Sequence, residues 1–511
     1  MEIAQKHAMI DIGSNSIRLV VIGIDKDYFC EELLNFKVVA RLSNYIDDRQ
    51  NLSDEGQITL LRVLRRFLAI IRREPKITVV DAVATAAMRK AANREDVFDY
   101  IFQHTGLHIR LLSGLQEATY GFSAIINSTE IENGISIDIG GGSTEVTLFR
   151  NRELAHAHSF PFGAVTLYKT YFGSNDPQAI KRLENYLKTV FSEFKWLINQ
   201  PLPVIGIGGT ARNLCKIDQA EQHYPMVGLH QYIMPRSRLN ALTERLAAMP
   251  QSEREVMDGL SKDRADIILP AAIVINTLVR LNHGESFMLS GEGLREGVFY
   301  EWMLKERGEK QIPHVLQESI RHLRRNFNLD SLHASYVKKL AFQIFDGISS
   351  LLPDDFLHPE TAWLLSHSAD LAYIGEYVNN ESSSSHTFYL LTNININGIT
   401  HHNRLRLALV ASFKNRLKMI DFAAPFERFL SKSELKQCEL LGATLRLAHD
   451  FDRTRQHVIS QLKVKLVKKK NVLIQACYHD DAYFEEQAAQ KHKKHLERVL
   501  QMPVTIQFIK E

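Results

Sequence analysis

The stretch Ile10-Asp11-Ile12-Gly13-Ser14-Asn15-Ser16 recurs as Ile137-Asp138-Ile139-Gly140-Gly141-Gly142-Ser143. Each copy closes one strand-like run and opens another, Ile17 to Ile22 and Val146 to Phe149. A tight Gly/Ser turn exposes backbone N–H groups and hydroxyls, which suit phosphate oxygens. The Asp beside it suits a hard cation, because such cations take oxygen ligands. Two copies of one hairpin therefore predict two related lobes whose turns face a common cleft.

Three glycine turns supply the candidate phosphate-binding residues. A single Asp-Gly-Ser turn could be an ordinary hairpin, because these residues dominate turns. Glycine runs, however, weaken a strand end unless a backbone must approach something closely. A third turn, within Ile205 to Thr210, follows an apolar run. Because it comes after the first two glycine turns in the chain, it strengthens the prediction of a phosphate-binding site. The predicted phosphate-binding residues are Gly13, Ser14, Asn15, Ser16, Gly140, Gly141, Gly142, Ser143, Gly208, Gly209 and Thr210.

Acidic residues beside the turns are candidate ligands of Mg²⁺. Asp138 and Glu145 stand in one predicted hairpin, and Asp11 stands in the other. Mg²⁺ usually keeps several waters and takes one or two carboxylates plus substrate phosphates. The alternative for Glu145 is an ordinary solvated strand residue. We predict that Asp138 holds the cation, with help from Glu145 or Asp11.

Glu117 and Arg89 are the candidate catalytic residues. Glu117 follows Ser113-Gly114 and falls in the first turn of a predicted helix, where it can reach a water. An acidic residue at a helix start is also favourable simply because of the helix dipole. Arg89 follows a predicted strand, and a guanidinium fork matches phosphate oxygens; alternatively it is a surface arginine.

Composition narrows the class of protein. The 511 residues include 45% hydrophobic residues, and the net charge of +3 is nearly neutral, so a polyanion would have to be held by local basic patches. We expect no nucleic-acid partner. The four cysteines include no CxxC pair. This pattern is typical of a protein in a reducing compartment and not of a fold held by disulfide bonds. The longest apolar stretch, Ile267 to Val279, is shorter than the roughly 20 residues of a membrane span. With no signal pattern at the N-terminus, we predict a cytoplasmic protein that does not enter a membrane.

The order of predicted elements divides the chain. Strands and helices alternate as far as Tyr300, which argues for an α/β class. Residues 314–450 have the pattern of helices, and the last segment returns to strands with a helix over Glu485 to Gln501. We predict four parts: lobes at 1–125 and 126–305, a helical domain at 306–455 and a small α/β appendage at 456–511.

The motifs together resemble those of a known family. In order they are Asp11-x-Gly-Ser-Asn-Ser16, Ala84-Thr85 with Arg89 and Asn93, Ser113-Gly-x-x-Glu117-Ala118, Asp138-x-Gly-Gly-Gly-Ser143-x-Glu145, Gly206-x-Gly-Gly-Thr210 and Gly293-Leu-Arg-Glu-Gly297. This set resembles the exopolyphosphatase/guanosine pentaphosphate phosphohydrolase family of the actin-like ATPase superfamily. The resemblance implies two ribonuclease-H-like lobes and Mg²⁺-dependent removal of the terminal phosphate of inorganic polyphosphate. It matches Glu117 to the catalytic glutamate, matches Asp138 and Glu145 to essential acidic positions, and suggests a homodimer.

The helical region resembles the HD-like domain of the longer family members but departs from an active HD metal site. Where His-Asp would precede Ile-Gly, the chain has Ala372-Tyr373-Ile374-Gly375. Where Arg-x-Ala-Asp would stand, it has Arg446-Leu447-Ala448-His449. Both changes predict that this domain binds or scaffolds and does not hydrolyse.

Alternatives remain open on sequence alone. The nearest is hydrolysis of guanosine pentaphosphate to the tetraphosphate at the same site. Another is an ATP-dependent kinase or chaperone-like ATPase of the same superfamily. A third is a catalytically weak regulator that senses polyphosphate or nucleotides, although Glu117, Asp138 and Glu145 together argue against it.

Overall fold

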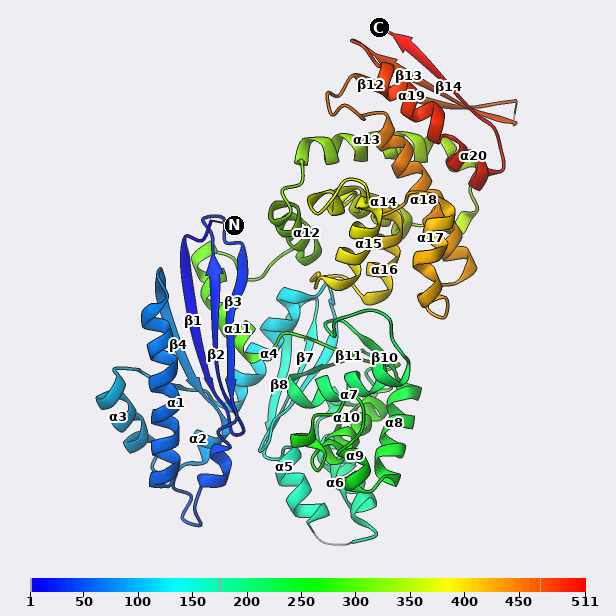
Figure 1. The fold of residues 1–511 in the computed structure, drawn as a ribbon. Helices are drawn as coiled ribbons and strands as arrows, with labels where there is room; N and C mark the ends of the chain where they lie inside the picture. Colours follow the sequence, from blue (N-terminus) through cyan, green and yellow to red (C-terminus); the bar gives the residue numbers. More distant parts are fainter. Residues whose placement is uncertain (1, 174–175, 469) are drawn as a thin grey trace. The chain divides into compact units, whose positions relative to one another are not determined.

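The chain folds into two compact units. The computed structural model describes residues 2–173, 176–468 and 470–511. The first unit comprises Met1–Tyr224 with Leu229–Val315, and the second comprises Pro225–Gly228 with Leu316–Glu511. Figure 1 shows two sheets in the first unit, and helices with a small terminal sheet in the second. No helix in the described residues combines the length and the apolar character that a membrane crossing requires.

The first sheet has five strands in the order β3-β2-β1-β4-β5. β1 pairs antiparallel with β2 and parallel with β4. The strands are β1 (Gln5–Ile12), β2 (Ile17–Ile24), β3 (Cys30–Val38), β4 (Ile77–Ala84) and β5 (Arg110–Leu111). The helices of this part are α1 (Asp54–Arg73), α2 (Ala86–Lys90), α3 (Arg94–Thr105) and α4 (Gly114–Ser128).

The second sheet repeats this plan. Its order is β10-β11-β9-β6-β7-β8, so β6, β7, β8 and β9 correspond to β1, β2, β3 and β4. The strands are β6 (Gly134–Ile139), β7 (Thr144–Arg150), β8 (Glu153–Phe160), β9 (Val204–Ile207), β10 (Ile233–Pro235) and β11 (Ser286–Leu289). The helices are α5 (Ala164–Leu167), α6 (Ala179–Ser192), α7 (Gly208–Glu221), α8 (Arg236–Ala248), α9 (Gln251–Arg254), α10 (Ile268–Asn282) and α11 (Leu294–Arg307).

Helices form where apolar residues recur at helical spacing. The Ser53 side chain caps α1, and the buried face of that helix carries Leu60, Leu64, Phe67 and Ile71. The long apolar stretch after Ile267 becomes α10, which is buried almost throughout because it runs through the core of the second lobe. Its apolar residues therefore serve packing.

Two central helices join the lobes. On α4, Phe122 and Ile125 pack in a cluster with Phe149 of the second sheet. On α11, Phe299 and Met303 pack in a cluster with strands of the first sheet. Each lobe thus contributes a helix to the core of the other, and Figure 1 shows both helices between the sheets. This arrangement fixes the start of α4, where Glu117 lies.

The second unit begins with helices and ends with a sheet. Its helices are α12 (Val315–Asn326), α13 (Ser331–Ile348), α14 (Pro359–Asp370), α15 (Ser383–Asn393), α16 (His401–Ala411), α17 (Arg416–Ala423) and α18 (Lys432–Asp450). The terminal sheet has the order β12-β13-β14, with β12 (Ile459–Val467), β13 (Asn471–Tyr478) and β14 (Val504–Lys510). The single helix expected over 485–501 is instead two, α19 (Tyr483–His492) and α20 (Lys494–Leu500).

Candidate active site

A cavity of about 390 Å³ opens where the two duplicated hairpins meet. The β1–β2 and β6–β7 turns close with the same hydrogen bond. Gly13 N donates to Ser16 O at 3.0 Å, and Gly140 N donates to Ser143 O at 3.0 Å. Asp11 and Asp138 both line this cavity, together with Glu117. The two turns therefore face one cleft, as the repeat predicts.

Most of the predicted phosphate-binding residues line the cavity. They are Gly13, Ser14, Asn15, Ser16, Gly140, Gly141, Ser143, Gly208 and Gly209. Gly142 and Thr210 are not among the lining residues. The Thr210 hydroxyl is buried and donates to Ile139 O at 3.3 Å, so it ties α7 to β6 beneath the cleft. A Cβ at Gly142 would meet Lys90 Nζ at 2.9 Å, so Gly142 allows the lysine to approach the second turn.

The local sequence fixes the start of α4. The Ser113 and Gln116 side chains form a reciprocal capping box, which places Glu117 in the first helical turn. The Glu117 carboxylate accepts a hydrogen bond from Arg89 Nη1. The same Nη1 donates to Leu112 O at 2.9 Å, and Arg89 Nη2 donates to Ser143 Oγ at 3.4 Å. Arg89 does not line the cavity itself but connects Glu117 of one lobe with the second hairpin of the other.

Glu145 is held close to α4 by a serine and a glycine. The Ser159 hydroxyl donates to Glu145 Oε1 at 2.8 Å. A Cβ at Gly114 would lie 2.3 Å from Ser159 Oγ, so only glycine at the first position of α4 leaves room for this hydroxyl. Gly114 thus lets the second lobe bring Glu145 toward the helix that carries Glu117.

Three carboxylates of the cleft, Asp138, Asp11 and Glu145, have a raised pKa. Burial, together with the charges of Glu145 and Asp11, raises the pKa of Asp138 from 3.8 to about 7. Burial also raises the pKa of Asp11 and of Glu145, although Arg295 opposes it at Asp11 and Ser159 at Glu145. Arg295 Nε lies 3.8 Å from Asp11 Oδ2. Such crowded acidic groups gain stability when positive charge enters the cleft.

Gly208 forms the support of Asp138. Its φ of +80° is in the left-handed region, and a Cβ there would meet Asp138 Oδ1 at 2.5 Å. No other residue type satisfies both conditions without a shift of the backbone or of the carboxylate. The third glycine turn is therefore required for the position of Asp138.

Sequence reasoning missed most of the cations in this cleft. Arg18 and Lys37 stand in register across the first sheet, because Asp11 pairs with Arg18 and Arg18 pairs with Lys37. Arg18 could have been predicted from the sequence, because the hairpin pattern places it opposite Asp11. The remaining cations that line the cleft are Arg212, Lys216, Arg264 and Arg295.

The cleft fits Mg²⁺ held partly by substrate and water. Among the described residues, no three His, Cys, Asp or Glu side chains come together as a complete metal site. Mg²⁺ needs only one or two carboxylates when phosphate and water supply its other ligands. Asp138 and Asp11 fit that role, because burial and like charge make both carboxylates favour neutralisation.

Comparison with known proteins identifies two family models that match the chain. The model of the Ppx/GppA phosphatase family matches residues 20–306, and the model of domain III of the same phosphatases matches residues 315–496. The chain belongs to the Ppx/GppA phosphatase family. One Ppx/GppA relative, the "Guanosine-5'-triphosphate,3'-diphosphate pyrophosphatase" of Photobacterium profundum, is 26% identical over 464 residues, which are 89% of each chain.

Solved Ppx/GppA structures show the same fold. The Aquifex aeolicus family member is 26% identical, with a TM-score of 0.54 over 59% of this chain and 98% of its own. A structure of an exopolyphosphatase from Cytophaga hutchinsonii ATCC 33406 is 24% identical, with a TM-score of 0.55 over 60% of this chain and 99% of its own. The expected class is confirmed: two actin-like α/β lobes followed by a helical domain.

Proposed function

We propose that the chain is an Mg²⁺-dependent exopolyphosphatase, which hydrolyses the terminal phosphate of inorganic polyphosphate and releases orthophosphate. The observation that carries this proposal is the meeting of both duplicated turns, Glu117 and a row of cations around one cavity. Phosphoryl transfer needs mainly positioning and stabilisation of charge. Membership in a phosphatase family supports the same class of reaction.

Each element of the cleft has a defined task in this proposal. The backbone N–H groups and hydroxyls of the two turns hold the terminal phosphoryl group. Glu117 orients a water and accepts its proton at a carboxylate oxygen, while Arg89 holds that carboxylate in place. Mg²⁺, when bound at Asp138 with Asp11 or Glu145, would supply charge stabilisation for the phosphoryl oxygens. Arg18, Lys37 and the other cleft cations hold the rest of the anionic chain.

The lining of the cleft favours polyphosphate over a nucleotide. No aromatic side chain is among the lining residues that the structure describes. Nucleobases are commonly held by stacking on aromatic rings, which contributes about 1–3 kcal/mol per base. A chain of phosphates needs only cations and N–H donors. The lining provides six cations, beside six carboxylates, and the backbone N–H groups of the glycine turns.

Guanosine pentaphosphate is the second candidate substrate. It is favoured by one observation, the name of the Photobacterium profundum relative, which aligns along most of this chain. The same turns and the same glutamate would then act on the 5′-terminal phosphate of the nucleotide.

Phosphate release measured side by side separates the candidates. Polyphosphates of defined length, guanosine pentaphosphate and ATP are offered at equal concentrations of phosphoanhydride bonds, with and without Mg²⁺. We expect the highest kcat/KM with polyphosphate. Preference for guanosine pentaphosphate would establish the second candidate, and preference for ATP would indicate a kinase-like or chaperone-like ATPase. No release from any substrate would leave a sensing regulator. We further propose that the enzyme is a cytoplasmic homodimer.

A further inference from the structure

The second unit contains two adjacent cavities, far from the cleft in sequence. One has a volume of about 500 Å³ and the other about 970 Å³. Both are lined by Tyr373, Glu376, Asn380, His449 and Arg455. Cavities of 300–1,000 Å³ are the size of small-molecule sites. Tyr373 and His449 are the residues that replace the expected HD residues, so the substitutions face these cavities.

His449 is buried against two other rings and has a polar atom without a hydrogen-bond partner among the described residues. The imidazole is 6% exposed, and its Nε2 has no hydrogen-bond partner in the part of the chain that the structure describes. The Tyr373 ring lies 4.2 Å away between centroids, and the His333 ring meets it edge-on at 5.1 Å. Burial and the neighbouring charges of His333, Arg453, Arg455 and Arg446 keep the pKa of His449 well below its ordinary value, so the ring is neutral. A buried polar atom normally has a partner, and a ligand in the cavity would provide one.

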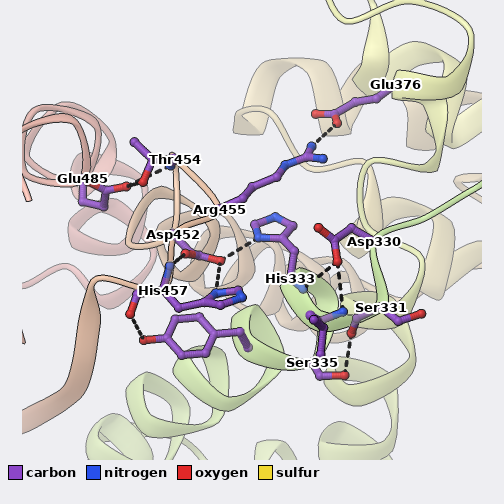
Figure 2. A network of polar contacts seen from close by, with 12 residues as sticks. Asp330, Ser331, His333, Ser335, Glu376, Asp452, Thr454, Arg455, His457 and Glu485 are labelled. Carbon is purple, nitrogen blue, oxygen red and sulfur yellow. Dashed lines mark hydrogen bonds and ion pairs between the residues drawn. The ribbon is translucent and has the colours of Figure 1, made fainter.

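A polar network connects residues that line the smaller cavity, among them His333, Glu376 and Arg455 (Figure 2). The fully buried Asp452 carboxylate accepts from His333 Nδ1 at 2.7 Å and from His457 Nδ1 at 3.0 Å. Arg455 donates to Glu376 at 2.7 Å, which joins the loop after α18 to the segment after α14. The loop is also fixed by Thr454, whose hydroxyl donates to Glu485 at 2.6 Å. The cavities are therefore part of an ordered scaffold.

The smaller cavity has an aromatic wall. Phe327 and Tyr377 line it and form an edge-to-face pair with 5.3 Å between ring centroids. Tyr377 is 63% exposed although it is a large aromatic residue. The three carboxylates of this cavity are already engaged. Asp330 caps α13, Asp370 accepts from Lys338, and Glu376 accepts from Arg455. What remains is a surface suited to a flat, uncharged ring.

The larger cavity has an excess of positive charge. Five cations line it, Lys414, Arg446, Arg453, Arg455 and Lys491, against the three carboxylates Glu376, Glu381 and Asp450. Glu376 is paired with Arg455, and Asp450 accepts from His492 at 2.8 Å. Lys414, Arg453 and Lys491 are exposed and form no ion pair with the described residues. These three side chains are free to bind phosphate oxygens.

We propose that the two cavities together form a nucleotide-binding site, separate from the catalytic cleft. The base lies against Phe327 and Tyr377, and the phosphates lie against Lys414, Arg453 and Lys491. The shared residue His449 offers its Nε2 to the sugar or base. Such a site contrasts with the cleft, which has cations but no aromatic wall among its described lining residues. The inference concerns binding alone and does not depend on which substrate the cleft hydrolyses.

The test uses the full chain carrying Glu117→Gln, so that a bound nucleotide is not consumed. Titration calorimetry compares ATP, GTP, inorganic tripolyphosphate and adenosine, and cross-linking with 8-azido-ATP locates the site by peptide mapping. We expect labelled peptides around 327–337 or 373–380. We expect ATP or GTP to bind this site at least about tenfold more tightly than tripolyphosphate, a difference that corresponds to about 1.4 kcal/mol.

Variants at exposed positions keep the test independent of folding. Arg453→Glu with Lys491→Glu should weaken nucleotide binding at this site about tenfold or more, and Tyr377→Ala should weaken it severalfold. Lys463→Glu, an exposed lysine on β12 that lines neither cavity, is the matched control and should change nothing. Labelling confined to peptides of the catalytic cleft would overturn the proposal. So would equal affinities of tripolyphosphate and ATP in the component of binding that the Arg453 and Lys491 changes weaken, or nucleotide binding that these changes leave unaltered. Phosphate release by the wild-type enzyme is measured in a separate assay. If that assay showed no release, the nucleotide-binding result could still be interpreted.

Discussion

Asp11 and Asp138 occupy equivalent positions in the two duplicated hairpins, and the charge of Asp11 raises the pKa of Asp138. Each is the next-to-last residue of its strand. Each also has a charged partner on the following strand, Arg18 opposite Asp11 and Glu145 opposite Asp138. The duplication thus produced two similar turns with opposite charges beside them. One side is suited to hold an anion and the other to attract a cation.

Replacing Gly208 by alanine should impair catalysis. The new Cβ would overlap Asp138 Oδ1 and would also sit at a positive φ. The left-handed conformation costs a non-glycine residue roughly 1–2 kcal/mol. Gly106→Ala is the matched control, because Gly106 also has a positive φ (+73°) but nothing lies within 4 Å of its Cβ position. Both variants should unfold at lower temperature, and only Gly208→Ala should lose phosphate release. Equal activity of the two variants would remove Gly208 from the support of Asp138.

Stability should depend on pH through Asp138. The folded chain keeps this proton to about pH 7, whereas the ordinary pKa is 3.8. The folded state therefore binds more protons than the unfolded state between these values, and the free energy of unfolding falls as the pH rises through the window. One such proton corresponds to a slope of up to about 1.4 kcal/mol per pH unit. Asp138→Asn should reduce that slope in denaturant unfolding with EDTA present; parallel curves for the two proteins would contradict the shift.

Mg²⁺ should stabilise the folded chain without any substrate. A ligand that binds only the folded state raises its stability by mass action, and above pH 7 the ionised Asp138 is ready to receive a cation. We expect a rise in Tm on addition of Mg²⁺ at pH 8, which Asp138→Asn abolishes. Asp99→Asn, at an exposed carboxylate on α3, is the control and should retain the full rise. An equal rise in the Asp138 variant would place the cation elsewhere.

The cleft cations should make polyphosphate affinity sensitive to salt. Arg18→Ala and Lys37→Ala each remove one cation from the lining. By analogy with counterion release from nucleic acids, affinity should fall steeply with salt, and each variant should flatten that dependence. Arg65→Ala, on the exposed face of α1, serves as control. The measurement is the Kd for a defined polyphosphate at several salt concentrations. A wild-type Kd that does not change with salt concentration would show that the cleft does not hold polyphosphate by ionic contacts.

Local sequence predicted the parts of the site that local structure determines. The hairpins, the glycine turns and the first turn of α4 each follow from residues close to one another in the chain, so their patterns were readable. Arg212, Arg264 and Arg295 were not predicted as site residues, because they reach the cleft only through long-range packing. Thr210 was expected at the surface of the cleft, yet its hydroxyl is used internally by Ile139. That contact depends on how α7 packs against β6, which no local pattern specifies.

The helical unit also has features that depend on long-range packing and that the sequence did not predict. Sequence showed that Tyr373 and His449 stand where active HD residues would be expected, and predicted a domain that binds or scaffolds. It did not show that the two rings lie against each other or that they line cavities with an aromatic and a cationic side. Those features arise from α13, α14, α18 and the loop after α18 coming together.

The central claim is that Glu117 acts on water at a phosphoryl group held by both hairpins. The most direct test is Glu117→Gln, with single-turnover phosphate release and equilibrium binding measured on the same polyphosphate of defined length. Loss of a general base typically costs about 10²–10⁴ in rate. We predict a loss of at least this size with Kd changed by less than about threefold, on the order of 0.6 kcal/mol, and unchanged release by the control Glu95→Gln on α3. Release by Glu117→Gln at the wild-type rate would contradict the account.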